Sequence, residues 1–229
     1  MKKRIQIDSS ILSAIVILTG ILYLFPKLYA QNRILDNIFD CLGLILILEG
    51  NFFRMAARGH KKSFSQKGNS LVTTGPYMLS RNPMYLGSFL IGSGFVLLVW
   101  PWWCLPIFAG LFYVRFNKQI LKEEEHLQKH FGDQYRQYCD KVPRLFPSLK
   151  NLSVLNINDI INFEELFSTK EKRSLWGWIG LAVVLETFQE FLVLGYSDIK
   201  TTLIIFTITL IAYGIGFFLV YKASVISHE

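Results

Sequence analysis

One stretch of 33 residues without a charge, Asn82–Val114, limits the possible folds of this chain more than any other feature. As a single helix it would extend roughly 50 Å at ~1.5 Å per residue, more than the ~30 Å hydrocarbon core of a membrane. Its centre reads Trp100-Pro101-Trp102-Trp103. Because proline ends helices and tryptophan favours the membrane interface, the stretch predicts a tight hairpin of two short spans.

Four further apolar stretches predict the rest of the fold. Hydrophobic residues make up 52% of the 229 residues, and they gather into blocks, as they do in membrane proteins. The first block follows a basic start but lacks a small-residue cleavage site, so we interpret it as a retained span and not a signal peptide. Together with the hairpin these blocks predict an all-α, polytopic transmembrane protein of about six spans. The four blocks are Ser9–Pro26, Asp36–Phe53, Ser174–Ser197 and Thr201–Tyr221.

The basic residues give this topology an orientation. If the N-terminus is inside, 21 of the 24 lysines and arginines lie on the inner side, and only Lys27, Arg33 and Lys200 lie outside. The positive-inside rule then places both termini and the two polar segments, 54–81 and 115–173, in the cytoplasm. The net charge of +7 therefore indicates a membrane surface and not a nucleic-acid partner.

The predicted hairpin leaves the cytoplasmic face and returns to it, which brings two unusual segments together. The first segment reads TGPYMLSRNPMYLG (74–87), and the second reads KEEEHLQKHFGDQYRQYCDKVPRLFP (122–147). Any chemistry is therefore expected at the cytoplasmic surface, between these two segments.

The first segment has the features of an anion site. Gly75-Pro76 predicts a turn, and Pro83 suits the first position of a helix, where its missing N–H is not needed. A helix N-terminus offers free N–H groups to a carboxylate or phosphate, and the fork of Arg81 would bind the same anion. The alternative is that Arg81 is a charged residue at the membrane boundary, with its head group reaching water.

The second segment has the features of a cation site. Glu123–Glu125 are expected to begin a helix that returns from the membrane, and three adjacent acids favour a positively charged ligand. The alternative is ion pairing with nearby Arg115, Lys118 and Lys122.

Both segments contain aromatic residues. Leu127, Phe131, Tyr135 and Tyr138 form an apolar stripe that we expect to lie on the membrane surface. Tyr77, Tyr85 and Tyr135 offer aromatic faces for a cation or a base ring.

Metal ligation is not expected here. His126 and His130 have i, i+4 spacing beside the acids, but the order is not HExxH, so a solvated helix face is the better interpretation. Cys41, Cys104 and Cys139 are far apart and fit small buried hydrophobic residues. An anion site beside a cation site instead suits a zwitterion such as S-adenosylmethionine, which has a carboxylate, an ammonium and a sulfonium.

The two segments resemble the isoprenylcysteine carboxyl methyltransferase family and the related phospholipid N-methyltransferases. The family pattern is GPY…RHPxYxG, a short helical hairpin, and then EExxLxxxFGxxYxxYxxxVP. The matching segments here are GPYMLSRNPMYLG and EEEHLQKHFGDQYRQYCDKVP, with the glutamate pair at Glu123 and Glu124. The resemblance covers about Ile45–Pro147, close to half of the chain.

The resemblance implies S-adenosylmethionine as methyl donor and a lipophilic acceptor that enters from the bilayer. The acceptor would be an isoprenylcysteine-like carboxylate, or a lipid amine or thiol. Arg81 and Asn82 are then the expected catalytic residues. The expected cofactor-binding residues are Tyr77, Arg81, Asn82, Pro83, Tyr85, Gly87, Glu123 and Glu124.

The chain departs from the family at two places. The histidine of the family pattern is Asn82 here, whose amide does not titrate, so it cannot accept the proton of an amine acceptor. The C-terminal part extends beyond the shared motifs. We therefore expect a methyltransferase core at 1–149 and a linker with a C-terminal transmembrane hairpin at 150–229.

Two other functions stay open at this point. A steroid-reductase-like membrane oxidoreductase would have similar helices, but no phosphate-binding glycine loop is evident. A non-catalytic transport or scaffold protein is suggested by Glu186 and Glu190, two acids one turn apart in a span. Their face is expected to pack against the core or line a cavity, unless it lies near enough to the outer interface to be hydrated.

Overall fold

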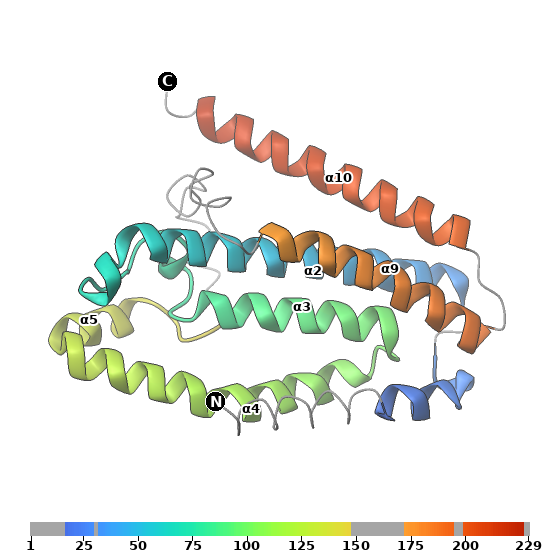
Figure 1. The fold of residues 1–229 in the computed structure, drawn as a ribbon, viewed down its shortest axis with the longest axis horizontal. Coiled ribbons are helices and arrows are strands. Elements are labelled where there is room, and N and C mark those ends of the chain that lie inside the picture. Colours follow the sequence, from blue (N-terminus) through green and yellow to red (C-terminus); the bar gives the residue numbers. More distant parts are fainter. Residues whose placement is uncertain (1–16, 30–31, 148–171, 195–198, 227–229) are drawn as a thin grey trace.

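The computed structural model describes residues 17–29, 32–147, 172–194 and 199–226, and within these ranges the chain is helical, without strands (Figure 1). The expected all-α fold is confirmed. Three short 3-10 turns, η1, η2 and η3, cover Pro26–Leu28, Gln66–Gly68 and Gly75–Met78. The α-helices are α2 (Arg33–Phe64), α3 (Pro83–Val99), α4 (Cys104–Phe131), α5 (Asp133–Lys141), α9 (Lys172–Leu194) and α10 (Ile199–Ile226).

Helices α2 and α3 form the closest pair in the bundle, and glycines allow their close approach. A Cβ atom on Gly50 would lie 2.5 Å from the backbone oxygen of Gly87, and one on Gly94 would lie 2.4 Å from that of Gly43. The two glycine pairs are seven residues apart on each helix. Small residues at such spacing let membrane helices pack backbone to backbone, which fixes the start of α3 against α2.

The central helical hairpin is confirmed, whereas its two membrane crossings stay a prediction. Helix α3 begins at Pro83 and ends at Val99, and α4 begins at Cys104, so the turn is Trp100–Trp103. The indole N–H of Trp100 donates to Oγ1 of Thr19 at 2.8 Å, while Trp102 is 57% exposed at the tip. The start of α3 at Pro83 also confirms the position expected for that proline.

The expectation that Glu123–Glu125 begin a new helix is wrong. Helix α4 continues past Val114 without interruption to Phe131, so the three acids lie well inside it. The chain has no glycine or proline between Gly110 and Gly132, and therefore nothing breaks the helix where its composition turns polar. Gly132, at φ +53°, ends α4.

The stripe expected on the membrane surface packs inside the protein instead. Tyr135 and Tyr138 are buried, and Val142 joins them in a cluster against Tyr77 and Leu71. The break at Gly132 turns α5 back onto the loop before α3, which covers the aromatic residues with protein. Leu127 and Phe131, from the end of α4, complete this cluster.

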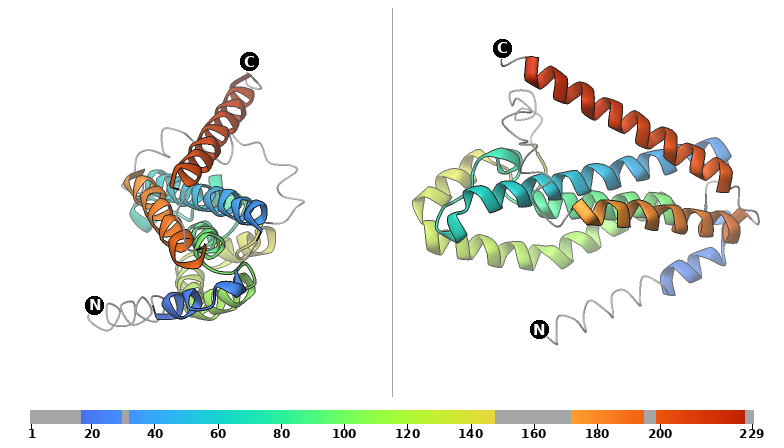
Figure 2. Two further views of the ribbon diagram at one scale, coloured as in Figure 1. Left: turned by 90° about the vertical axis from the view of Figure 1, so that its right-hand side faces the viewer. Right: turned by 45° about the horizontal axis from the view of Figure 1, so that its top comes forward.

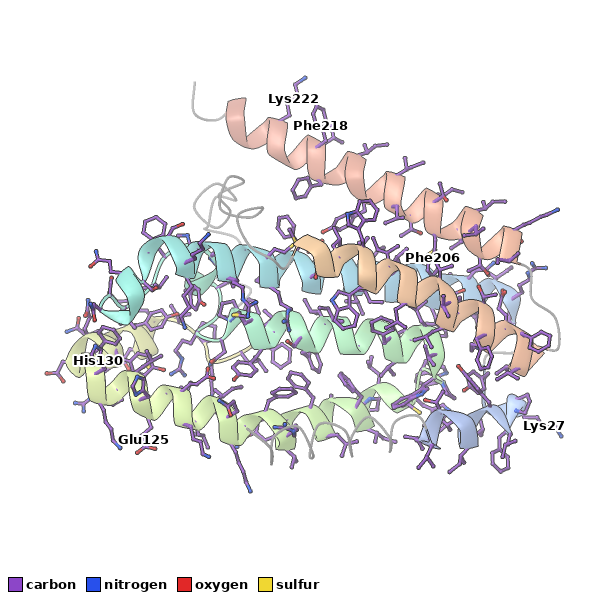
Figure 3. All side chains as sticks on the ribbon, viewed as in Figure 1. Lys27, Glu125, His130, Phe206, Phe218 and Lys222 are labelled. Atoms are coloured by element: carbon purple, nitrogen blue, oxygen red, sulfur yellow. The ribbon has the colours of Figure 1, made fainter. Side chains whose placement is uncertain are left out.

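Helices α9 and α10 pack onto the outside of the α2–α3 pair. Ala182 of α9 and Phe206 of α10 join a buried cluster with Leu44 and Ile47 of α2, and Phe206 is marked on α10 in Figure 3. Glu186 of α9 is only 1% exposed. The expectation that the acidic face of this helix packs against the core is confirmed.

Two described helices have the length and hydropathy to cross a membrane, within α9 at Leu175–Val193 and within α10 at Ile199–Leu219. Helix α3, with 17 residues, is apolar but shorter. Of the expected first span, Ser9–Pro26, residues 9–16 lie outside the described residues, and residues 17–23 are helical. The ends expected in the cytoplasm gather together in Figures 1 and 2: α5, the end of α2 and the start of α3 lie at one end of the bundle. Figure 3 shows Glu125 and His130 at this end and Lys27 at the other.

Candidate functional site

The loop before α3 is held by a close contact with α2. Gly75 has φ +61°, and a Cβ atom there would lie 2.8 Å from the ring of His60, so this position requires glycine. Nε2 of His60 lies 2.8 Å from Oγ1 of Thr74. The expected turn at Gly75-Pro76 is confirmed as η3, and it directs the following residues toward α4 and α5.

Backbone contacts clamp this loop to the segment that follows α5. The backbone N–H of Arg81 donates to the carbonyl of Pro143 at 3.0 Å. The side-chain amide of Asn82 donates to the carbonyl of Arg144, also at 3.0 Å, and Ser80 donates to the same oxygen at 3.5 Å. The side chain of Asn82 therefore binds the main chain, and this contact positions Arg144 beside the start of α3.

Glu124 lies between two arginines. Its Oε2 accepts from Nε of Arg144 at 3.0 Å, and its Oε1 lies 3.5 Å from Nη1 of Arg81. Arg144 also donates from Nη1 to Asn117 at 2.9 Å, and Arg81 donates to Sγ of Cys139 at 2.8 Å. The carboxylate is mostly buried, so both ion pairs are shielded from water and oriented by several bonds.

Glu123 accepts hydrogen bonds from neutral partners. The hydroxyl of Tyr85 donates to its Oε1 at 2.8 Å, and the amide of Gln119 donates to the same oxygen at 3.0 Å. Burial raises the pKa of Tyr77, and the nearby charge of Glu123 raises it further, although Arg58 opposes this. Tyr77 therefore stays protonated at neutral pH and presents a hydroxyl donor next to the acid.

Three polar atoms at the centre of this site are buried and have no hydrogen-bond partner among the described residues. They are Nε of Arg81, Nη2 of Arg144 and Oε1 of Glu124. Buried polar groups are normally satisfied, so two donors and one acceptor without hydrogen bonds, beside the ion pairs of Glu124, indicate a place for a ligand with both anionic and cationic groups.

An apolar cavity of about 110 Å³ opens beside these charges. Asn117 and Arg144 are its polar residues, and Arg144 joins the cavity to Glu124. Its walls come from α3, α4 and the segment after α5, mainly through aromatic rings. They include Phe89, Phe112, Phe116, Ile120, Leu145 and Phe146.

The structure brings most of the expected site residues together, but two of them face elsewhere. Gly87 faces Gly50 and Arg54 of α2, where it permits helix packing. Pro83 is fully buried at the first turn of α3. The residues that meet between the loop, α4 and α5 are Tyr77, Arg81, Asn82, Tyr85, Glu123 and Glu124.

Arg144 was not among the expected site residues, although it makes the shortest ion pair to Glu124. Its signal in the sequence is a single arginine between Pro143 and Pro147, next to Leu145 and Phe146. A charge within such a short, apolar, proline-bounded segment is costly unless it has a buried partner.

The alternative for the three acids was ion pairing with nearby basic residues of α4. Glu124 does form ion pairs, but its partners are Arg81 and Arg144, which lie outside α4. Glu125 pairs with Lys129 at 2.7 Å on the exposed face, and Lys129 lowers the pKa of that carboxyl. His126 and His130 lie one turn apart, with ring centroids separated by 6.3 Å.

Comparison with known proteins shows which families this chain is similar to. Residues 38–134 match the phospholipid methyltransferase family. The chain is 33% identical over 129 residues to a protein-S-isoprenylcysteine O-methyltransferase of Saccharomyces cerevisiae, covering 52% of this chain and 54% of that protein. Protein-S-isoprenylcysteine O-methyltransferase A of Arabidopsis thaliana is 34% identical over 144 residues, which are 58% of this chain and 68% of that protein.

A protein that is not named as a methyltransferase is also similar to this chain. The cobalt-zinc-cadmium resistance protein CzcN of Cupriavidus metallidurans is 28% identical over 129 residues, which are 55% of this chain and 56% of that protein. The match to the yeast protein likewise spans about half of that protein's length. No solved structure matches this chain.

Proposed function

The chain belongs to the family of isoprenylcysteine carboxyl methyltransferases and phospholipid methyltransferases, which are integral membrane proteins, and from this premise we propose that it methylates a lipophilic acceptor with S-adenosylmethionine as donor. The acceptor that fits best is a carboxylate of the isoprenylcysteine kind. The observation that carries the proposal is Glu124, which is held between Arg81 and Arg144 at the edge of an apolar cavity.

The side chains at the centre of the site fit the charged groups of this donor. The unpartnered Nε of Arg81 and Nη2 of Arg144 are donors for a carboxylate, and Oε1 of Glu124 is an acceptor for an ammonium. Tyr85, whose ring packs against Phe116, adds an aromatic face for a cation or a base ring. When bound, the donor supplies an electrophilic methyl group on its sulfonium.

Methyl transfer is an in-line displacement, so the main task of the protein is to align the nucleophile with the methyl group. A carboxylate acceptor is already ionised at neutral pH and needs no base. An amine acceptor would need one, and the amide of Asn82 cannot take up a proton. The guanidinium of Arg144 also attracts an anionic acceptor and repels an ammonium, which favours the carboxylate.

The apolar cavity is the proposed place for the lipid part of the acceptor. Its volume of about 110 Å³ is below the ~300 Å³ of small ligand pockets, so it would hold only part of the lipid chain. Leu111 and Val114 of α4 are exposed on the side that would face the bilayer. An acceptor in the membrane would therefore reach the cavity by displacing lipid, not water.

We propose the expected topology together with this function: about six spans, with both termini and the cofactor pocket in the cytoplasm. The apolar helices α9 and α10 and the distribution of the basic residues support it. The proposed division is a methyltransferase core at 1–149 and a linker with a transmembrane hairpin at 150–229. No specific observation favours the reductase or the scaffold.

Binding of S-adenosylmethionine to the purified protein tests whether it is the methyl donor. Calorimetry with S-adenosylmethionine should give one site, and Glu124→Gln should weaken it on the order of tenfold or more, because a charge-assisted bond is lost in a shielded site. Glu125→Gln is the matched control, since Glu125 is the exposed neighbour. Equal affinity of wild type and Glu124→Gln would remove Glu124 from the donor site.

Transfer of a labelled methyl group tests the acceptor. Three membrane-soluble acceptors should be offered: a prenylated cysteine with a free carboxylate, the same compound as its amide, and an aminophospholipid. Label is expected only in the first. Label in the phospholipid alone would contradict a carboxylate acceptor. Absence of both donor binding and label, with binding of a reduced nicotinamide, would instead establish the reductase.

A further inference from the structure

Three carboxylates converge at the end of the bundle opposite the candidate methyltransferase site. Asp36 and Asp40 come from the first turns of α2, and Glu186 comes from α9. One oxygen from each lies within 4.8 Å of the others. Figure 1 shows this end of α2 beside the end of α9, whereas Figure 3 marks Glu125 and His130 at the far end.

The cluster is buried in protein. Asp40 is 5% exposed and Glu186 is 1% exposed, and these two carboxyl groups lie within hydrogen-bond reach of each other. No other group in the described part of the chain donates a hydrogen bond to either oxygen of Glu186. The carbonyl oxygen of Gln189, one turn further along α9, is buried and unpartnered as well. Three oxygens of two side chains therefore lack a donor of the kind that buried polar groups normally have.

A third helix, α10, makes a polar contact near this cluster. Oγ1 of Thr202, in the first turns of α10, donates to Oε2 of Glu190 at 3.1 Å, and Glu190 follows Glu186 by one turn. Arg33, one turn before Asp36, donates to Thr201 at 3.4 Å. Within the described ranges, no lysine or arginine forms an ion pair with Asp36, Asp40 or Glu186.

Like charges this close repel strongly in a low-dielectric setting, so either a cation or protons must neutralise the group. We propose that Asp36, Asp40 and Glu186 form a binding site for one divalent cation of the kind that prefers oxygen ligands, such as Mn²⁺, Mg²⁺ or Ca²⁺. Carboxylate and amide oxygens are the donors that these cations choose, and Gln189 supplies an amide oxygen one turn away. The sequence had suggested no metal site, because the acids come from helices far apart in the chain.

The position of the site gives the cation a structural role. It joins α9, and through Glu190 and Thr202 also α10, to the start of α2. The cation would thus fasten the C-terminal hairpin to the core by cross-linking carboxylates that otherwise repel. The inference does not depend on the proposed methyl transfer, since the two sites lie at opposite ends of the bundle.

The test uses the full-length chain in lipid nanodiscs and Mn²⁺ as the probe. Electron paramagnetic resonance should detect one bound Mn²⁺ per chain, and Glu186→Gln and Asp40→Asn should each weaken binding roughly tenfold or more, because affinity follows the number of charged ligands. Mn²⁺ should also raise the unfolding temperature of the wild type but not of Glu186→Gln. Glu125→Gln, at the exposed surface, is the control that should keep both properties.

Equal Mn²⁺ affinity in the wild type and in both variants would overturn the proposal, as would no bound Mn²⁺ in the wild type. Infrared spectra distinguish the competing explanation, which is that protons neutralise the acids. A carboxylic acid band that Glu186→Gln removes, and that saturating Mn²⁺ leaves unchanged, would assign protons to the cluster and exclude the cation.

Discussion

At the scale of single residues, the candidate site alternates positive and negative groups, with Glu124 between Arg81 and Arg144. Partly buried ion pairs of this kind contribute little net stability but are costly to break, because the remaining charge stays shielded from water. Asn82 has a different task, since its amide fixes the backbone that carries Arg144. Its expected catalytic role stays a prediction, whereas its positioning contact is part of the structure.

Substitution of Asn82 tests this positioning role. Asn82→Ala removes one hydrogen bond to the carbonyl of Arg144 and should destabilise the protein by about 1 kcal/mol. Asn82→Asp should cost more, about 1–3 kcal/mol, because a carboxylate would face a carbonyl oxygen without a proton to share. Thermal unfolding in one detergent measures the order. If the aspartate variant were as stable as the wild type, the amide would not be the donor.

At the scale of elements, the α2–α3 pair fixes the geometry of the whole bundle. Gly43 and Gly50 of α2 meet Gly94 and Gly87 of α3, with backbone oxygens where side chains would otherwise be. Helix α3 cannot shift along α2 without losing this fit, so the loop at its start is held at a fixed depth. Such rigidity would suit the proposed methyl transfer, in which a donor and an acceptor must be aligned.

A pair of glycine substitutions separates packing from helix propensity. Gly50→Ala would place a Cβ atom 2.5 Å from the backbone oxygen of Gly87, so we expect destabilisation of about 1–3 kcal/mol or more. Gly110→Ala in α4, where nothing lies within 4 Å, should be neutral or stabilising by up to about 1 kcal/mol. Unfolding temperatures in the same detergent give the comparison. Equal effects of the two changes would contradict close packing at Gly50.

The hairpin at Trp100–Trp103 and the start of α3 at Pro83 could be predicted, because proline and tryptophan act locally. The continuation of α4 through the acids was missed, since a change in polarity does not end a helix that lacks a breaker. Arg144 and the acids near Asp36 were missed for another reason. Their partners are distant in sequence, and only the packing of the helices brings them together.

At the scale of the whole molecule, the two clusters of charge lie at opposite ends of the bundle. The candidate methyltransferase site lies where α5 meets the loop before α3, and the carboxylate cluster lies where α9 meets the start of α2 (Figure 1). The C-terminal hairpin packs on the core through Ala182 and Phe206, away from the first site.

Cysteine labelling tests the orientation of the molecule in the membrane. In a background without Cys41, Cys104 and Cys139, a cysteine at Lys62 should be shielded from an impermeant thiol reagent in intact cells, and one at Trp102 should react. Both side chains are exposed in the structure, at opposite ends of the bundle. The distribution of basic residues predicts this result. Labelling at Lys62 without lysis would reverse the topology and place the site outside.

The length of α3 also bears on the loop before it. Its 17 residues extend roughly 25 Å at ~1.5 Å per residue, about 5 Å less than an average hydrocarbon core. No residue of α3 is exposed, because α2, α4 and α9 pack around it, so lipid would meet those helices and not α3 itself. If α3 crosses the hydrocarbon core, the loop at its start would lie slightly inside the membrane, where protein must cover its backbone polar groups, as the contacts of Arg81 and Asn82 with the segment after α5 do.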